Sequence, residues 1–134
     1  MKKLSLLLAI ICVLLYCSAC FAGHRYIEID KSEYGYVYLD TYTLTKNEEN
    51  NSFDCWVKFL FTDKGQKHYD LGNIRSAIEN YVFYPDRTYT LYSFAYYDKY
   101  ERLIKQNDIP EYELENKYIT PETLMEIIWI YLYK

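Results

Sequence analysis

The sequence predicts an α+β protein in which a single antiparallel β-sheet carries a C-terminal α-helix packed on one face. Apolar residues recur at every second position through most of the chain, which is the period of a β-strand. Near the end of the chain they recur with helical spacing instead. With 134 residues, the chain is too short for two ordinary domains. Because 51% of the residues are apolar and 19% are aromatic, that one domain has enough material for a core.

The first 22 residues have the character of a secretory signal. Two lysines precede an apolar run over residues 4–16, which is too short to span a bilayer with margin, and small residues follow it. A signal anchor is the alternative for this run. Cleavage between Ala22 and Gly23 matches the small-residue preference of signal peptidase. We therefore expect residues 1–22 to be a signal peptide and residues 23–134 to be the exported domain.

Lipidation is the competing outcome of processing. Residues 17–20 read CSAC and resemble a bacterial lipobox, although Cys17 stands where leucine is usual. Acyl chains on Cys20 tether such a protein to a membrane. Soluble export and a lipid anchor both stay open, and both predict a location in the periplasm, at the outer membrane or on the cell surface.

The net charge of the chain restricts its partners. The formal charge is −4, and loss of the two signal lysines moves it to about −6. No basic stripe is present, which argues against nucleic acid as a partner and against electrostatic docking onto anionic lipid. We expect a protein partner, with membrane contact only through the signal or a lipid anchor.

The first half of the exported domain reads as strands. Residues 26–30 alternate as a short strand, and residues 35–45 have a β-rich composition. Residues 46–51 are polar and typical of a turn. Residues 52–62 alternate most cleanly, with five apolar side chains on one face: Phe53, Cys55, Val57, Phe59 and Phe61.

The next stretch is harder to assign. Residues 63–66 contain aspartate and glycine and predict a turn. Residues 71–81 have helical apolar spacing, so we expect a helical turn or an irregular crossing, followed by a strand that ends near Tyr84. Residues 84–88 read YPDRT and predict a turn.

The strand over residues 88–98 is apolar on both faces, which is typical of a central or covered strand. Strict alternation places small Ser93 and Ala95 on one face, with room for a packing helix. It places three bulky rings on the other face, namely Tyr92, Phe94 and Tyr96. Together with Trp129 of the terminal helix, these rings are the candidate partner surface. Cross-strand aromatic packing is the alternative role for these rings.

The chain is expected to end in a strand, a polar crossing and a helix. The strand passes through Leu103 and Ile104, and the crossing covers residues 106–119. Thr120 is a suitable N-cap, followed by Pro121 at the first helical position. The helix has almost no polar face, which indicates contact with the sheet and allows contact with a second subunit in a homodimer.

Reactive side chains are sparse. Cys55 lies between apolar neighbours and reads as a core thiol. His24 and His68 do not have metal-ligand spacing, and the abundant carboxylates read as a solvated face. No nucleotide-binding or hydrolase motif is present. We predict no catalytic residue, no metal and no cofactor, and hence no enzyme.

The order of landmarks along the chain is distinctive. It consists of YLDTYTL at Tyr38–Leu44, WVK at Trp56–Lys58, a tyrosine-rich hairpin at Glu79–Asp98, and ITPETLMEIIWIYLY at Ile119–Tyr133. This order resembles that of the surface-adhesin protein E family, which are small exported bacterial envelope proteins. The resemblance implies an antiparallel sheet with a packed helix and, for the namesake, adhesion to host matrix proteins.

The chain departs from that family at two points. Members often carry a cysteine in the hairpin strand and another near the C-terminus, but this chain has Phe83, Tyr84, Tyr131 and Tyr133 in those regions. The turn after the hairpin often contains glycine, and here residues 99–101 read KYE. We expect a non-enzymatic exported envelope protein that binds another protein in the manner of an adhesin. The alternative is a structural or accessory homodimer or lipoprotein with no host-binding role.

Overall fold

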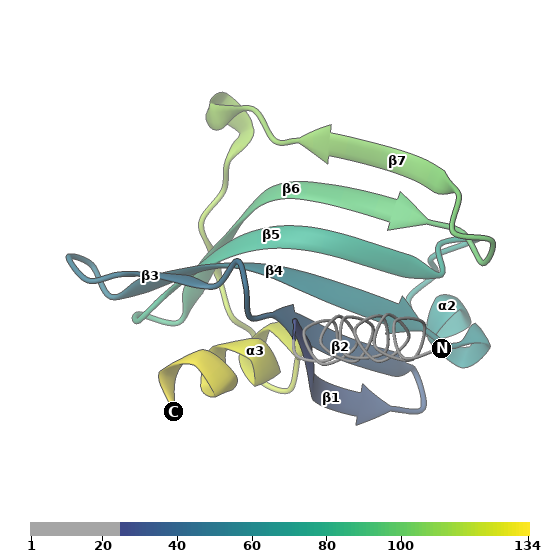
Figure 1. Cartoon of the computed structure of the whole chain (residues 1–134), viewed down its shortest axis with the longest axis horizontal. Helices are drawn as coiled ribbons and strands as arrows, with labels where there is room; N and C mark the ends of the chain where they lie inside the picture. Colours follow the sequence, from purple (N-terminus) through teal and green to yellow (C-terminus); the bar gives the residue numbers. More distant parts are fainter. Residues whose placement is uncertain (1–24) are drawn as a thin grey trace, which may run out of the picture.

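An eight-stranded antiparallel sheet and a C-terminal helix form the computed structural model, which describes residues 25–134 (Figure 1). The predicted α+β class is therefore confirmed. The predicted signal, with Cys20, Ala22, Gly23 and His24, lies outside the described residues.

The sheet has the strand order β1-β2-β4-β5-β6-β7, with β3 paired to β4 and β8 paired to β6. The strands are β1 (Tyr26–Ser32), β2 (Gly35–Asp40), β3 (Thr45–Asn47), β4 (Ser52–Phe61), β5 (Ser76–Tyr84), β6 (Thr88–Tyr97), β7 (Leu103–Asp108) and β8 (Lys117–Tyr118). The helices are α2 (Asp63–His68), α3 (Leu124–Tyr133) and the 3-10 turn η1 (Glu111–Glu113).

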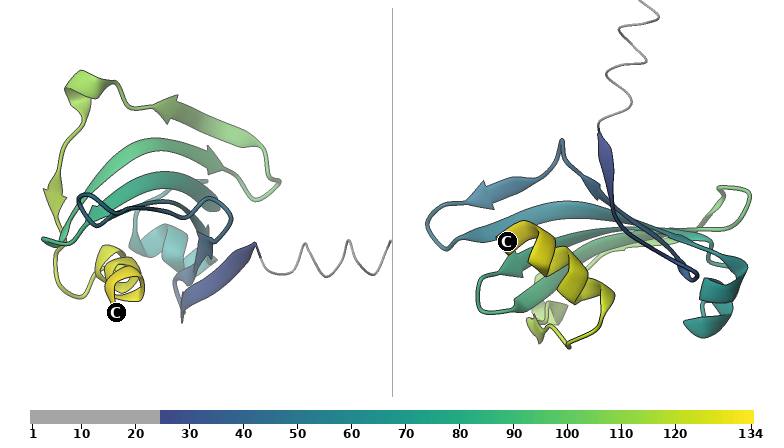
Figure 2. Two further views of the ribbon diagram at one scale, coloured as in Figure 1. Left: turned by 60° about the vertical axis from the view of Figure 1, so that its left-hand side comes forward. Right: turned by 90° about the horizontal axis from the view of Figure 1, so that it is seen from below.

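The sheet is curved, and α3 lies on its concave side (Figure 2). The core forms between them from alternate residues of the central strands and one residue of the helix. Its most enclosed members are Leu39, Cys55, Val57, Phe83 and Ile128, each with 0% of its surface exposed. The five-residue apolar face predicted for β4 is the same face that pairs with Ala77, Tyr81 and Phe83 of β5.

The C-terminal half of α3 is fastened to distant parts of the chain. The Trp129 Nε1–H donates to the Tyr84 carbonyl oxygen at 2.8 Å. The Tyr133 hydroxyl lies between the carbonyl oxygens of Asn51 and Phe83, at 2.7 and 2.9 Å, and shares its one proton with them. These bonds hold the helix against the β4 and β5 ends of the sheet.

Several predicted boundaries are wrong. The turn expected at residues 63–66 is the start of α2, where the Gly65 N–H donates to the Thr62 hydroxyl at 3.1 Å as an N-cap. The strand expected over residues 35–45 ends at Asp40. Residues 76–84 are fully extended as β5, because pairing with β4 outweighs their helical spacing.

The terminal helix begins later than predicted. Thr123, not Thr120, occupies the N-cap position, and its hydroxyl donates to the Thr120 carbonyl oxygen at 2.7 Å. Glu122 has φ of +62°, which is incompatible with a right-handed helix. Residues 120–123 therefore form a turn that delivers the chain to α3.

A bulge in β6 overturns the predicted assignment of its faces. Asn80 pairs with Ser93 and Tyr81 pairs with Leu91, so Tyr92 has no partner on β5. A prediction from strict alternation does not include this extra residue. Every side chain after the bulge therefore lies on the face opposite to the one predicted. Ser93 and Ala95 consequently lie on the face away from α3, so they do not provide the space for the helix that the sequence predicted.

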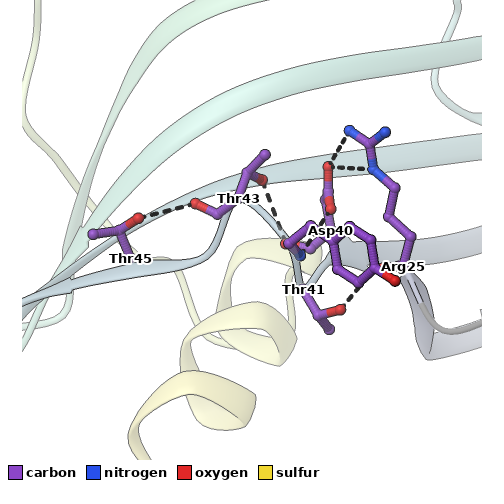
Figure 3. A network of polar contacts seen from close by, with 6 residues as sticks. Arg25, Asp40, Thr41, Thr43 and Thr45 are labelled. Atoms are coloured by element: carbon purple, nitrogen blue, oxygen red, sulfur yellow. Dashed lines mark hydrogen bonds and ion pairs between the residues drawn. The ribbon is translucent and has the colours of Figure 1, made fainter. Parts of the chain in front are cut away.

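The described chain begins with a polar contact that closes the β1–β2 edge (Figure 3). The Arg25 Nε and Nη2 atoms donate to the Asp40 carboxylate at 3.1 and 2.9 Å. The other Asp40 carboxylate oxygen accepts the Tyr42 N–H at 3.0 Å. Burial opposes ionisation of Asp40, but the guanidinium and the amide together lower its pKa below the ordinary value.

Candidate aromatic groove

The concave face of the sheet is only partly covered by α3, and the uncovered part is hollow. A hollow of about 220 Å³, here named the central hollow, is lined by Phe59, Phe61, Leu71, Glu79, Tyr81 and Met125. Its floor comes from β4 and β5, and its wall comes from the first turn of α3. Tyr69 and Leu124 complete its lining, which is apolar except for one carboxylate and two phenols.

Two larger hollows adjoin the central hollow. The first, of about 590 Å³, shares Tyr69, Leu124 and Met125 with it and continues toward Tyr34 and Tyr118. The second, of about 420 Å³, shares Tyr81 with it and is lined further by Tyr89, Leu91, Phe94, Lys105 and Lys117. Together the three hollows are named the aromatic groove.

The strand register explains why rings collect in this groove. Tyr81 pairs with Leu91, and Phe83 pairs with Tyr89, so both strands point aromatic and apolar side chains toward the same side. The Tyr81 and Tyr89 rings meet edge to face with centroids 5.8 Å apart. Beyond the bulge, Phe94 and Tyr96 lie on the same face and stack at 4.7 Å.

Glu79 is the carboxylate of the groove. It pairs with Val57 on one side and with Phe94 on the other, so it points to the concave face among apolar residues. The hydroxyls of Tyr81 and Tyr96 both donate to it. Burial raises the pKa of Glu79 above its ordinary value, although these two hydrogen bonds act in the opposite direction.

The two phenols beside Glu79 keep their protons at neutral pH. Burial, followed by the Glu79 charge, raises the pKa of Tyr96 to about 12 and raises that of Tyr81 well above its ordinary value. Both tyrosines are therefore permanent hydrogen-bond donors to the carboxylate.

The predicted partner surface is not one surface. Phe94 and Tyr96 lie on the concave face, and Phe94 lines the groove. Tyr92 lies at the bulge, where it hydrogen-bonds with Tyr84. Trp129 is engaged by the Tyr84 carbonyl oxygen, by stacking on Tyr133 at 4.9 Å, and by Arg87, whose guanidinium carbon is 4.9 Å from the ring. Of the four residues, only Phe94 therefore contributes to the groove.

Cys55 and His68 both lie outside the lining of the central hollow. Cys55 is buried, and burial followed by the nearby Asp54 charge raises its pKa to about 12. The His68 ring stacks on Tyr34 with centroids 4.1 Å apart, at the margin of the groove. Within residues 25–134, no three side chains of the metal-binding types gather closely enough to hold an ion.

Among residues 25–134, no helix combines the length and the apolar character needed to cross a bilayer.

Comparison with known proteins adds no relative. No protein-family model matches the sequence, and no curated protein matches it either. The resemblance to surface-adhesin protein E therefore stays an expectation from the sequence motifs.

Sequence reasoning missed Glu79 and Tyr81 because it expected a helical turn or an irregular crossing within residues 71–81 and did not fix where the strand ending near Tyr84 begins. Read as a strand, Ala77, Glu79, Tyr81 and Phe83 occupy one face, and the single carboxylate on that face stands out. The signal was present in the alternation of β5, but its use required the strand assignment.

Proposed function

We propose that this chain is a non-enzymatic, exported binding protein that holds part of a partner protein in the aromatic groove. The observation that carries the proposal is the run of adjoining hollows beside α3, lined by tyrosine and phenylalanine rings. Rings of this kind provide a large contact area with few rotatable bonds, which suits protein recognition. The buried, high-pKa thiol of Cys55 adds no nucleophile to the groove.

A solid-phase binding screen against matrix proteins, together with pull-down from envelope extract, tests this proposal. Tyr118→Ala removes an exposed ring that lines the groove, and Tyr112→Ala removes a ring of similar exposure that lies outside the hollows described above. The exposed fractions are 82% and 86%. Binding that weakens at least tenfold in Tyr118→Ala but not in Tyr112→Ala supports the groove. Equal binding by both variants contradicts it.

Export is the second part of the proposal and rests on the sequence of residues 1–22. Mass spectrometry of the protein from its native host separates the outcomes. A free N-terminus at Gly23 indicates soluble export, and acylated Cys20 indicates a lipid anchor. An intact Met1 in the host contradicts cleavage of the segment.

A homodimer is the second candidate, and β7 favours it. All six residues of this edge strand are exposed, including Leu103 and Ile104 at 53% and 41%. An open edge strand can pair with a second copy of itself. Light scattering over a dilution series decides between a stable dimer and a monomer with a free groove.

A further inference from the structure

Glu79 differs from Asp40, the one carboxylate of residues 25–134 that is fully buried. Asp40 is 1% exposed and is neutralised by the Arg25 guanidinium at 2.9 Å. Glu79 lies in an apolar hollow, yet within residues 25–134 it forms no ion pair with any lysine, arginine or histidine. Its polar contacts are the Tyr81 and Tyr96 hydroxyls.

The two hydroxyls leave acceptor capacity on the carboxylate. An ionised carboxylate offers about four lone-pair sites, and two phenol donors occupy two of them. Glu79 lines the central hollow, so the rest of its acceptor capacity is accessible to an occupant of that hollow. A charge enclosed in apolar surroundings is costly unless it is paired.

The walls restrict the occupant to a cation with an apolar body. Phe59, Phe61 and Tyr81 present aromatic rings, and ring faces attract cations. Leu71, Leu124 and Met125 offer only apolar contact. The Glu79 charge repels an anion, and a neutral apolar molecule leaves the carboxylate unpaired.

We propose that the central hollow is a subsite for an alkylammonium group, whose nitrogen pairs with Glu79 while its carbon chain packs against the apolar and aromatic walls. Lysine side chains of a partner protein and free alkylamines share this chemistry. The inference rests on the proposed function only for the lysine source, because a free amine needs no partner protein.

Proton linkage supports the subsite. Burial holds the pKa of Glu79 above its ordinary value, and a bound cation lowers it again by favouring the charged form. Binding therefore releases protons and strengthens as the pH rises through the raised pKa. The titratable groups nearest Glu79 are Tyr69, Tyr81 and Tyr96; burial raises the pKa of each, so all three stay protonated in this range. On the same face, β7 contributes Lys105, whose ammonium nitrogen lies 5.7 Å from the ring centroid of Phe94 and forms no ion pair with Glu79.

Calorimetric titration of residues 23–134 with butylammonium chloride tests the proposal, with 1-butanol as the neutral analogue. Glu79→Gln keeps the size of the side chain and removes its charge. Glu49→Gln is the matched control, because Glu49 is an exposed carboxylate in the turn between β3 and β4 and lines none of the three hollows. We expect butylammonium to bind the unmodified protein and the control alike and to bind Glu79→Gln at least tenfold more weakly. Butanol should not distinguish the three proteins.

Two results overturn the subsite. One is equal butylammonium affinity in Glu79→Gln and the unmodified protein, and the other is no binding to a protein whose near-ultraviolet circular dichroism shows native packing. Peptides with lysine or norleucine at one position identify the source: a lysine preference that Glu79→Gln abolishes indicates a protein partner, and binding of the free amine alone indicates a small molecule.

The outcomes also separate this inference from the proposed function. Partner capture that is lost in Tyr118→Ala but kept in Glu79→Gln contradicts the lysine source and leaves the groove intact as a binding site. Butylammonium binding without any partner capture supports the subsite and contradicts the proposed function.

Discussion

Asp40, Cys55 and Glu79 are three enclosed side chains that can ionise, and the fold treats each one differently. Asp40 is kept charged by a guanidinium and an amide, and its pKa is lowered. Cys55 is kept neutral by apolar surroundings. Glu79 has two phenol donors and no cation, and its pKa is raised. The sequence located Cys55 in the core because its neighbours alternate cleanly, but the partners of Asp40 and Glu79 depend on strand register, which a single chain does not reveal.

The first prediction concerns Cys55. With a pKa of about 12 and no exposed surface, the thiol should not react with a thiol reagent such as dithionitrobenzoate in the native protein. In denaturant, the single thiol of residues 23–134 should react fully within minutes. Absorbance of the released thiolate measures both rates. Fast reaction of the native protein contradicts the burial of Cys55 and makes this thiol a candidate nucleophile again.

The second prediction concerns Asp40→Asn. The variant loses the charge-assisted bonds to Arg25, so its free energy of unfolding at pH 7 should fall by about 1–3 kcal/mol. Because the pKa of Asp40 is lowered in the fold, its contribution is present above about pH 4, the unfolded value, and disappears as the pH falls through the folded value.

Urea titrations at pH 7 and pH 3 measure this difference. The gap between Asp40→Asn and the unmodified protein should narrow at pH 3. Glu33→Gln is the control, because its ion pair with Lys64 is exposed on both sides and should matter little. A gap that is unchanged between the two pH values contradicts the proposed role of the charge.

At the scale of elements, the sequence predicted strands better than their boundaries. β4 was recoverable because its alternation is uninterrupted, and the turn before β6 because proline and aspartate mark it. The end of β5 near Tyr84 was predicted, but its start was not, because its local spacing conflicts with its pairing. The faces of β6 were reversed beyond Leu91 by one inserted residue. The groove depends on both of these strands, so its residues could not be assembled from sequence.

Helix α2 gives a prediction at this scale. A β-carbon on Gly65 would lie 1.8 Å from the Tyr34 carbonyl oxygen, so the backbone must shift to accept one. Gly65→Ala should destabilise the protein by about 3 kcal/mol, the upper end for overpacking. Gly72→Ala is the control: unlike Gly65, Gly72 has a left-handed φ of +59°, but nothing lies within 4 Å of the added carbon, and a loss of about 1 kcal/mol is expected. Thermal unfolding measures both, and equal losses contradict the packing explanation.

At the scale of the whole molecule, the last element closes the core that the first strands begin. Ile128 of α3 is fully buried with Leu39 of β2 and Phe83 of β5. The Trp129 side chain bonds to a backbone carbonyl 45 positions earlier in the chain, and the Tyr133 side chain to one 50 positions earlier. Contacts of this length couple the helix to the sheet, so we expect the protein to unfold in one step.

Tryptophan fluorescence tests that cooperativity. The chain has two tryptophans, and Trp56→Phe leaves Trp129 as a reporter of α3 alone. Its fluorescence transition in urea should coincide with the far-ultraviolet circular dichroism transition of the sheet. A fluorescence midpoint at clearly lower urea would show that α3 detaches first and that the groove can open independently.

With a lipid anchor on Cys20, the Arg25–Asp40 contact would also set how close the domain can lie to a bilayer. If Cys20 carries acyl chains, four residues separate it from Arg25, and a fully extended chain of that length reaches about 17 Å. So short a connection would hold the β1–β2 edge of the sheet near the lipid headgroups. The opposite edge, β7, would then face away from the bilayer.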